Sequence, residues 1–253
     1  MGVRDKIHFT ASRGEVAQSA LKMLLDVYGQ TPIAEANVIV ALGGDGFMLQ
    51  TLHEGLNLPV YGMNRGTVGF LMNQFSAEDL NDRLALAEEA VIHPLSMTAQ
   101  TADGEIHKAL AINEVSLLRA GPQAAKLRIS VNGRVRMNEL ICDGAILSTP
   151  AGSTAYNYSA HGPILPIGAG VLALTGIASF RPRRWRGAIL PDAAKVRFEV
   201  LEPMKRPVMA DADSRSVQPV KWVEVELENR VSHRILFDPG HGLEERLMNE
   251  QFA

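Results

Sequence analysis

Over the first 90 residues, short apolar runs alternate with segments in which apolar residues recur every three or four positions. Three of the runs predict strands: "KIHFTAS" from Lys6, "ANVIVAL" from Ala36 and "LPVYGMN" from Leu58. The second run is apolar almost throughout, which is typical of a strand covered on both faces.

The segments between these runs have helical spacing. It predicts one helix from Arg13 to Gly29, a short helix through "FMLQTLHEG", and another that starts at Ser76, because Ser76 and Asp79 have the capping-box spacing. Alternating strands and helices are the pattern of βα units around a mainly parallel sheet. The first 90 residues therefore predict an α/β domain of Rossmann-like type.

Beyond about residue 91 the period of the pattern changes to two. The runs "HKALAINEVSLLR", "KLRISVNGRVRM" and "KWVEVELEN" alternate or are rich in β-branched residues, and Asn132-Gly133 in the second run is a hairpin signal. In the third run valines and glutamates fall on opposite faces, as in a half-buried strand. This part of the chain predicts a mainly antiparallel β domain.

Two domains follow from the change of period. We expect residues 1–90 to form the α/β domain and residues 91–238 to form the β-rich domain. The end of the chain, "DPGHGLEERLMNEQF", returns to helical spacing. We expect residues 239–253 to form a helix that packs back onto the first domain.

Composition narrows the class of protein. The chain has 253 residues, 46% hydrophobic and 21% charged, with a formal net charge of -3. This balance indicates neither a nucleic-acid partner nor a membrane partner. The lone Cys142 has no internal partner for a disulfide, and the N-terminus lacks the apolar core of a signal peptide. We expect a cytoplasmic protein.

The four residues Gly43-Gly44-Asp45-Gly46 follow directly after the middle predicted strand. Glycines at a strand's carboxyl end let backbone N–H groups approach a phosphate closely, at the edge of the sheet where ligands bind in α/β proteins. A carboxylate beside phosphates fits if it binds Mg²⁺ or accepts a proton from an attacking hydroxyl. The alternative is a turn in which Asp45 only caps the next helix.

A second stretch, "CDGAILSTPAGSTAYNYSAHGPILP" at 142–166, is dense in hydroxyl side chains and glycines. So many directional hydrogen-bonding groups suit the recognition of a polar ligand. A long Ser/Thr-rich connection in a β domain is the alternative interpretation.

Taken with "GTVGFL" at 66–71, "NEV" at 113–115 and "VMADAD" at 208–213, these motifs resemble the NAD kinases. The resemblance covers nearly the whole chain. It implies an N-terminal α/β domain and a C-terminal β domain that binds NAD. It also implies a kinase that transfers the γ-phosphate of ATP to the 2′-hydroxyl of the adenosine ribose of NAD, producing NADP. A divalent cation such as Mg²⁺ and a homodimer or homotetramer are implied as well, and polyphosphate is possible as a donor.

The resemblance also implies roles for individual residues. Asp45 falls on the motif aspartate next to the acceptor hydroxyl, where we expect it to accept or orient the proton and, as one option, to contact Mg²⁺. The ATP phosphates are expected beside Gly43, Gly44 and Gly46. The residues expected to contact NAD are Asn113, Glu114, Asp143, Thr154, Ala155, Tyr156, Ser159 and Asp211.

Several positions depart from the family's pattern, and two of these departures bear on the expected site. Phe47 stands where a small hydroxyl residue is usual, and "DAD" replaces a "DG", so that Asp213 is a candidate to substitute for or assist Asp211. Two rival readings stay open: another kinase with the same glycine motif, acting on a lipid or a sugar, and a dinucleotide sensor without catalysis. The arginine-rich run "RPRRWRG" at 181–187 is interpreted as a solvated or oligomer-contact surface rather than a phosphate site.

Overall fold

The computed structural model describes residues 5–66, 69–183 and 185–252. The chain divides into two compact units. The first comprises Met1–Ile92 and Ser232–Ala253, and the second comprises His93–Val231. Within the described ranges, none of the helices has the length and apolar character needed to cross a membrane.

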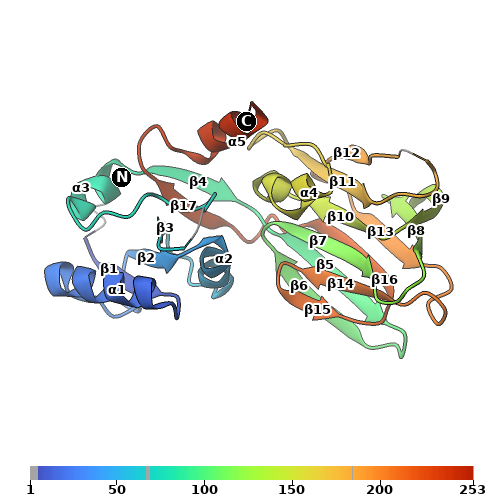
Figure 1. Ribbon diagram of the computed structural model, residues 1–253, viewed down its shortest axis with the longest axis horizontal. Helices are drawn as coiled ribbons and strands as arrows, with labels where there is room; N and C mark the ends of the chain where they lie inside the picture. The colour runs from blue at the N-terminus through green and yellow to red at the C-terminus, as the bar shows by residue number, and fades with distance from the viewer. Residues whose placement is uncertain (1–4, 67–68, 184, 253) are drawn as a thin grey trace. The chain divides into compact units, whose positions relative to one another are not determined.

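The first unit is built on a five-stranded sheet, labelled in Figure 1. Its order is β1 (Ile7–Ala11), β2 (Val38–Gly43), β3 (Val60–Asn64), β17 (His233–Phe237) and β4 (Glu88–Ile92). The first four strands run parallel and β4 runs antiparallel to β17. All six residues of β2 are buried, which is why the strand can be apolar throughout.

Helices pack on this sheet through small and aliphatic residues. In α1 (Glu15–Tyr28) the buried residues are Ala17, Ala20 and Leu24, and the helix ends where Gly29 adopts a φ of 72°. The other helices of this unit are α2 (Asp45–His53), α3 (Leu80–Leu86) and α5 (Leu243–Gln251).

The expected helix start at Ser76 is wrong by four residues. The Ser76 hydroxyl accepts a hydrogen bond from the backbone N–H of Glu78 at 3.1 Å, which closes a local turn. Asp79 then has a left-handed φ of 54°, so helical geometry begins only at Leu80. The turn chemistry of serine prevails over the capping-box spacing here.

The strand β17 was assigned by its sequence position to the β-rich domain, but it lies inside the first sheet. Ile235 pairs with Val60 of β3 in parallel register, and Phe237 pairs with Glu88 of β4. The partner strands lie more than 140 residues earlier in the chain, so the local pattern of β17 carried no sign of them.

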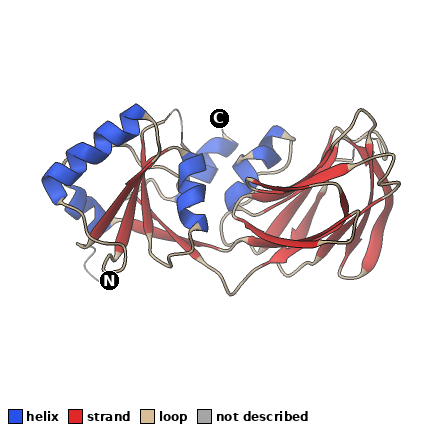
Figure 2. Cartoon of the chain, turned by 90° about the horizontal axis from the view of Figure 1, so that it is seen from below, coloured by secondary structure: helices blue, strands red, loops and turns tan. Residues whose placement is uncertain are grey.

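The second unit is a sandwich of two six-stranded sheets, visible as two layers of strands in Figure 2. One sheet has the order β12-β11-β10-β7-β14-β15 and the other β6-β5-β16-β13-β8-β9. Residues from both sheets form one hydrophobic core that includes Leu117, Leu147, Phe198 and Val225. The strands are β5 (Leu95–Thr101), β6 (Ile106–Ala111), β7 (Glu114–Arg119), β8 (Ala125–Val131), β9 (Arg134–Cys142), β10 (Gly144–Ser148), β11 (Val171–Ile177), β12 (Ala188–Pro191), β13 (Val196–Val200), β14 (Val208–Ala212), β15 (Arg215–Val217) and β16 (Val220–Leu227).

The predicted fold class, α/β followed by mainly antiparallel β, is confirmed. The Asn132-Gly133 hairpin joins β8 to β9, and both residues have positive φ, 51° and 74°. The run "HKALAINEVSLLR" is not one strand, however. It divides into β6 and β7, which belong to different sheets, and the break falls at Ile112 and Asn113.

Candidate functional site

Asp45 begins α2, with only Gly44 between it and the end of the buried strand β2. Its carboxylate accepts two backbone hydrogen bonds, from Phe70 N–H at 2.7 Å and from Leu71 N–H at 2.8 Å. Gly44 is the residue that caps the helix, and it does so without a side-chain hydrogen bond. The alternative that Asp45 is merely the helix cap is therefore wrong. One backbone amide on each oxygen fixes the orientation of the carboxylate and leaves each oxygen able to accept a further proton or ligand.

Of the three glycines around Asp45, only Gly43 is required by close packing. A Cβ on Gly43 would lie 2.8 Å from Phe47 Cβ. The Phe47 side chain therefore packs so closely on position 43 that a residue larger than glycine could not fit there. A Cβ on Gly44 or Gly46 would meet nothing within 4 Å. None of the three has the positive φ that would by itself demand glycine. Gly44 and Gly46 thus leave open space at the N-terminus of α2.

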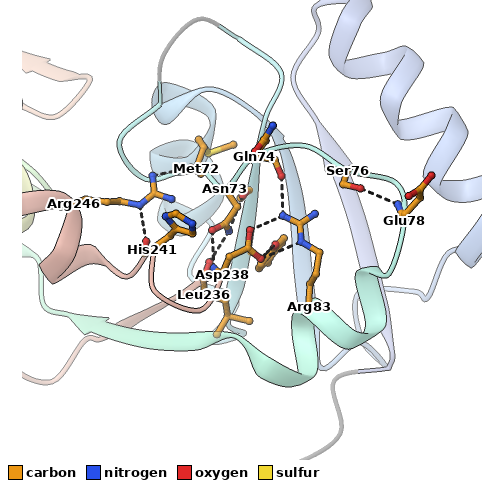
Figure 3. A network of polar contacts seen from close by, with 12 residues as sticks. Met72, Asn73, Gln74, Ser76, Glu78, Arg83, Leu236, Asp238, His241 and Arg246 are labelled. Atoms are coloured by element: carbon orange, nitrogen blue, oxygen red, sulfur yellow. Dashed lines mark hydrogen bonds and ion pairs between the residues drawn. The ribbon is translucent and has the colours of Figure 1, made fainter. Parts of the chain in front are cut away.

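Arg246 of α5 ties this segment to the end of the chain, as Figure 3 shows in part. Its guanidinium donates to the backbone oxygens of Phe70 at 3.1 Å, Met72 at 2.9 Å and His241 at 2.8 Å. Burial lowers the pKa of Arg246, and nearby Asp45 partly opposes this effect. The segment whose amides hold Asp45 is therefore itself held by a half-buried cation.

A second polar network in the first unit joins β3, α3 and the end of β17, shown in Figure 3 around Asp238. The Asp238 carboxylate accepts hydrogen bonds from Tyr61 Oη at 2.5 Å and from Arg83 Nη2 at 2.6 Å. Burial works to raise the pKa of Asp238, but the hydrogen bonds from Arg83 and Tyr61 outweigh it and lower this pKa. Burial raises the pKa of Tyr61. No predicted site residue belongs to this network, because its members come from three segments far apart in the chain.

In the second unit, the break between β6 and β7 presents Asn113 and Glu114. The carboxylate of Asp213 holds this break, accepting backbone hydrogen bonds from Ile112 at 2.7 Å and Asn113 at 3.0 Å. The Asp211 carboxylate instead accepts a hydrogen bond from the hydroxyl of Ser216. Asp213 therefore shapes the backbone of the "NE" segment, which is a different role from standing in for Asp211.

Glu114 has the most perturbed carboxyl group of this region. Burial, and then the charge of Asp213, raises its pKa to about 8. Its Oε2 is buried and has no hydrogen-bond partner among the described residues. Burial and the charges of Glu114, Asp143 and Asp211 raise the pKa of Tyr156, which shows that these acidic side chains lie in one neighbourhood. A carboxyl group with a strongly raised pKa beside several polar groups is typical of a binding or catalytic site.

The hydroxyl-rich loop packs directly on the "NE" segment. Thr149 Oγ1 donates to the backbone oxygen of Ile112 at 2.8 Å and accepts from Gly152 N–H at 3.0 Å. A Cβ on Gly152 would lie 2.2 Å from the backbone oxygen of Asn113, so only glycine fits there. The two motifs that carried the resemblance, "NEV" and "STPAGSTAY", thus meet in space.

Asn157 was not among the predicted site residues, yet its side chain anchors the hydroxyl-rich loop. It is fully buried in α4 (Tyr156–Ser159), which follows the short helix η1 (Ala151–Thr154). Its amide donates to the backbone oxygens of Ser153 and Pro163, each at 3.0 Å, and accepts from Thr175 Oγ1 at 2.6 Å. With Asn157 turned inward, the exposed Tyr156 and Ser159 remain on the outer side of the loop.

The other candidates are placed as follows. Thr154 and Ala155 are half-buried beside Tyr156, and Asp143 is paired with Arg119 at 2.6 Å. Burial raises the pKa of the Cys142 thiol to about 12, as for an unreactive core residue. Thr67 and Val68 of "GTVGFL", and one arginine of the "RPRRWRG" run, Arg184, lie outside the described residues.

Similarity to known proteins decides the family. Residues 112–232 match the ATP-NAD kinase C-terminal domain. The chain is 68% identical over 251 residues to an NAD kinase of Cereibacter sphaeroides, covering 98% of this chain and 99% of that protein. It is 57% identical to an NAD kinase of Caulobacter vibrioides, over 98% and 96% of the two chains. The chain belongs to the NAD kinase family.

Two solved structures share the fold of this NAD kinase family member. The yeast NADH kinase, solved with NADH, superposes with a TM-score of 0.82 over 97% of this chain and 86% of that chain, at 21% identity. The Archaeoglobus fulgidus NAD kinase, solved with ATP, has a TM-score of 0.73 over 96% of both chains, at 23% identity. The protein is a kinase that uses ATP to phosphorylate NAD to NADP, on the strength of its close relatives.

Proposed function

We propose that Asp45 is the general base of this reaction, accepting the proton of the ribose 2′-hydroxyl as the γ-phosphate is transferred. The observation that carries this proposal is the pair of amides, Phe70 N–H and Leu71 N–H, that hold its carboxylate. A base fixed by the backbone loses little orientational freedom when the substrate binds, and positioning is a large part of phosphoryl-transfer catalysis. General-base assistance is typically worth about 10²- to 10⁴-fold in rate.

The glycines contribute room for the donor phosphates in this proposal. Open space at Gly44 and Gly46, with the N-terminus of α2 between them, suits an anion that approaches the backbone N–H groups. Gly43 acts indirectly, because it accommodates Phe47 and so shapes the start of the helix.

A divalent cation, Mg²⁺ in the simplest case, belongs to the proposal as the partner of ATP. Among the described residues no group of three or more His, Cys, Asp or Glu side chains could hold a metal ion. Mg²⁺ is commonly bound by one or two carboxylates together with substrate phosphates, and Asp45 can supply one such carboxylate. When bound, the cation neutralises charge on the transferred phosphate.

The NAD site of the proposal lies in the second unit, on the surface made by the "NE" segment and the hydroxyl-rich loop. A dinucleotide brings ribose hydroxyls and an adenine amine, which are donors that the acceptors of Asn113, Glu114, Asp143 and Asp211 can pair with. The unpartnered Oε2 of Glu114 is the clearest such acceptor. Thr154, Ala155, Tyr156 and Ser159 supply the wall beside it. The yeast relative solved with NADH and the archaeal relative solved with ATP support a dinucleotide and a donor as the two substrates.

The assembly and location complete the proposal. We assign a homodimer or homotetramer and a cytoplasmic location, the latter in keeping with a single free cysteine that is buried. The first unit is assigned the donor and the base, and the second the NAD.

The Asp45→Asn variant tests the role of Asp45. Asparagine keeps the size of the side chain but has no basic oxygen to take a proton. We expect NADP formation, followed with an NADP-specific dehydrogenase, to fall by about 10² or more. Unchanged turnover would remove Asp45 from the role of base.

A further inference from the structure

The chain passes between the two units twice, and the two connections begin and end beside each other. β4 leads out of the first unit into β5, and β16 leads back into β17. Ile92 at the end of β4 pairs with His233 of β17. Leu95 at the start of β5 pairs with Leu227 of β16. The segments between these two pairs form the joint of the molecule.

Hydrogen bonds join the two connections to each other. The outgoing connection consists of His93 and Pro94, and the returning connection consists of residues 228–232. Nδ1 of His93 lies 2.8 Å from the backbone oxygen of Val231. The backbone N–H of Glu228 donates to the backbone oxygen of Pro94, also at 2.8 Å. Because a carbonyl oxygen only accepts, Nδ1 of His93 carries the proton in the first of these bonds.

The returning connection is itself built as a turn. The backbone N–H of Val231 donates to the backbone oxygen of Glu228 at 3.3 Å. The Glu228 carboxylate accepts hydrogen bonds from Arg230 Nε at 2.9 Å and Arg230 Nη2 at 2.8 Å. These side-chain bonds are the main reason why the pKa of Glu228 is lowered to about 2. The connection therefore has a defined turn structure rather than the open backbone of a flexible linker.

His93 and Val231 mark the limits of the second unit. His93 is its first residue and Val231 is its last. The hydrogen bond between them thus ties the entry of the chain into this unit to its exit. Hinges open through φ and ψ changes at a few residues between rigid parts, and a bond that spans both connections opposes such changes.

We propose that His93 is a positioning residue for phosphoryl transfer, because its hydrogen bond to Val231 limits the rotation of the two units about their joint. The inference rests on the proposed function, which assigns the donor and Asp45 to the first unit and NAD to the second. Transfer requires the 2′-hydroxyl to reach the γ-phosphate, and a misplacement of about 1 Å can lower the rate by about 10². A joint that turned freely would leave each substrate bound but less often in the reactive arrangement.

Three variants of His93 test the bond to Val231. His93→Ala removes the donor. His93→Asn keeps an N–H donor at the position of Nδ1, whereas His93→Gln places its donor one carbon further from the backbone. The matched control is His107→Ala, a histidine of β6 whose side chain is 42% exposed.

Steady-state kinetics are measured with each substrate varied at saturation of the other. We expect kcat to fall at least about tenfold in His93→Ala and His93→Gln, and to lie within about threefold of the wild type in His93→Asn. KM for ATP and KM for NAD should stay within about twofold in all three variants, because both binding surfaces are intact. His107→Ala should match the wild type.

A second measurement reports on the joint without turnover. Glu15→Cys on α1 and Arg134→Cys on β9 place one exposed cysteine in each unit for spin labels. Cys142 is buried and stays unlabelled. The labelled chain is diluted with unlabelled chain, so that pulsed electron paramagnetic resonance reports distances within one molecule. We expect the distance distribution to be broader in His93→Ala and His93→Gln than in the wild type and His93→Asn.

A lower kcat and a broader distribution, both restored in His93→Asn, would support the proposal. An unchanged kcat in His93→Ala, equal distance distributions, or no difference between His93→Asn and His93→Gln would overturn it. If His93→Ala melts at a lower temperature, the comparison of His93→Asn with His93→Gln decides, since both keep a polar side chain at this position. The label distances do not involve Asp45, so a failure of Asp45 as base leaves this test intact.

Discussion

Glu114 gives a prediction that separates stability from function. Its carboxyl group has a pKa of about 8 in the folded protein, against 4.5 for an unperturbed glutamate, chiefly because of burial. Between these two values the unfolded chain is ionised and the folded chain is protonated, so folding takes up a proton. The free energy of unfolding must therefore fall as the pH rises from about 4.5 to about 8.

The size of this effect follows from the shift. Each pKa unit is equivalent to about 1.4 kcal/mol, so the group costs up to about 5 kcal/mol of stability above pH 8. Glu114→Gln removes the titration. We expect the dependence of unfolding free energy on pH to be shallower in the variant, by up to about 1.4 kcal/mol per pH unit between pH 5 and 8.

The assay is urea unfolding followed by tryptophan fluorescence at a series of pH values. Both tryptophans of the chain, Trp185 and Trp222, lie in the second unit, so the signal reports the unit that contains Glu114. The matched control is Glu226→Gln, whose side chain is 53% exposed on β16. Equal pH slopes in the wild type and Glu114→Gln would refute the reasoning. Glu114→Gln should raise the stability above pH 8 but lower the affinity for NAD, because we expect the buried carboxyl group, which destabilises the fold there, to bind the ligand.

Two further variants probe the supports of the two sites. Arg246→Gln should lower kcat about tenfold with KM for NAD unchanged, because the carbonyls of Phe70 and Met72 that it holds belong to the segment whose amides bind Asp45. Partial recovery in Arg246→Lys would distinguish positioning from unfolding, and an unchanged kcat would contradict the idea. Gly152→Ala should lower the melting temperature of the second unit and abolish NAD binding, because its Cβ would lie 2.2 Å from the backbone oxygen of Asn113. Calorimetry measures both the melting temperature and NAD binding. The control is Gly121→Ala, in which the new Cβ lies 3.7 Å from its nearest neighbour. A Gly152→Ala protein indistinguishable from this control would refute the packing argument.

The parts of the fold that the sequence predicted are those with a strong local pattern. The apolar run of β2, the Asn132-Gly133 hairpin and the end of α1 at Gly29 are each specified by neighbouring residues. The strand β17 was misassigned because its place depends on pairing with β3, which no local pattern encodes. The start of α3 was misplaced because a serine turn competes with the capping-box spacing at Ser76.

The candidate site shows the same division. The motifs indicated Asp45 and Glu114, with Asp213 as a candidate beside Asp211, but the backbone contacts through which Arg246 and Asp213 hold the neighbouring segments could be recognised only once the chain was folded. Asn157 lies inside the hydroxyl-rich motif, and its buried amide donates a hydrogen bond to the backbone oxygen of Ser153 in the same motif.

The proposal that Asp45 takes the proton of the acceptor hydroxyl is tested most directly in single turnovers. The rate with ATP and NAD is measured for the wild type and Asp45→Asn, and NAD binding to both proteins is measured by calorimetry. Asparagine keeps an oxygen for one of the amides of Phe70 and Leu71 but places its NH2 group at the other, so equal melting temperatures of the two proteins are the control for folding. We expect NAD affinity within about twofold of the wild type and a rate lower by about 10² or more. An equal rate, or a loss of rate explained entirely by lost NAD binding, would contradict it.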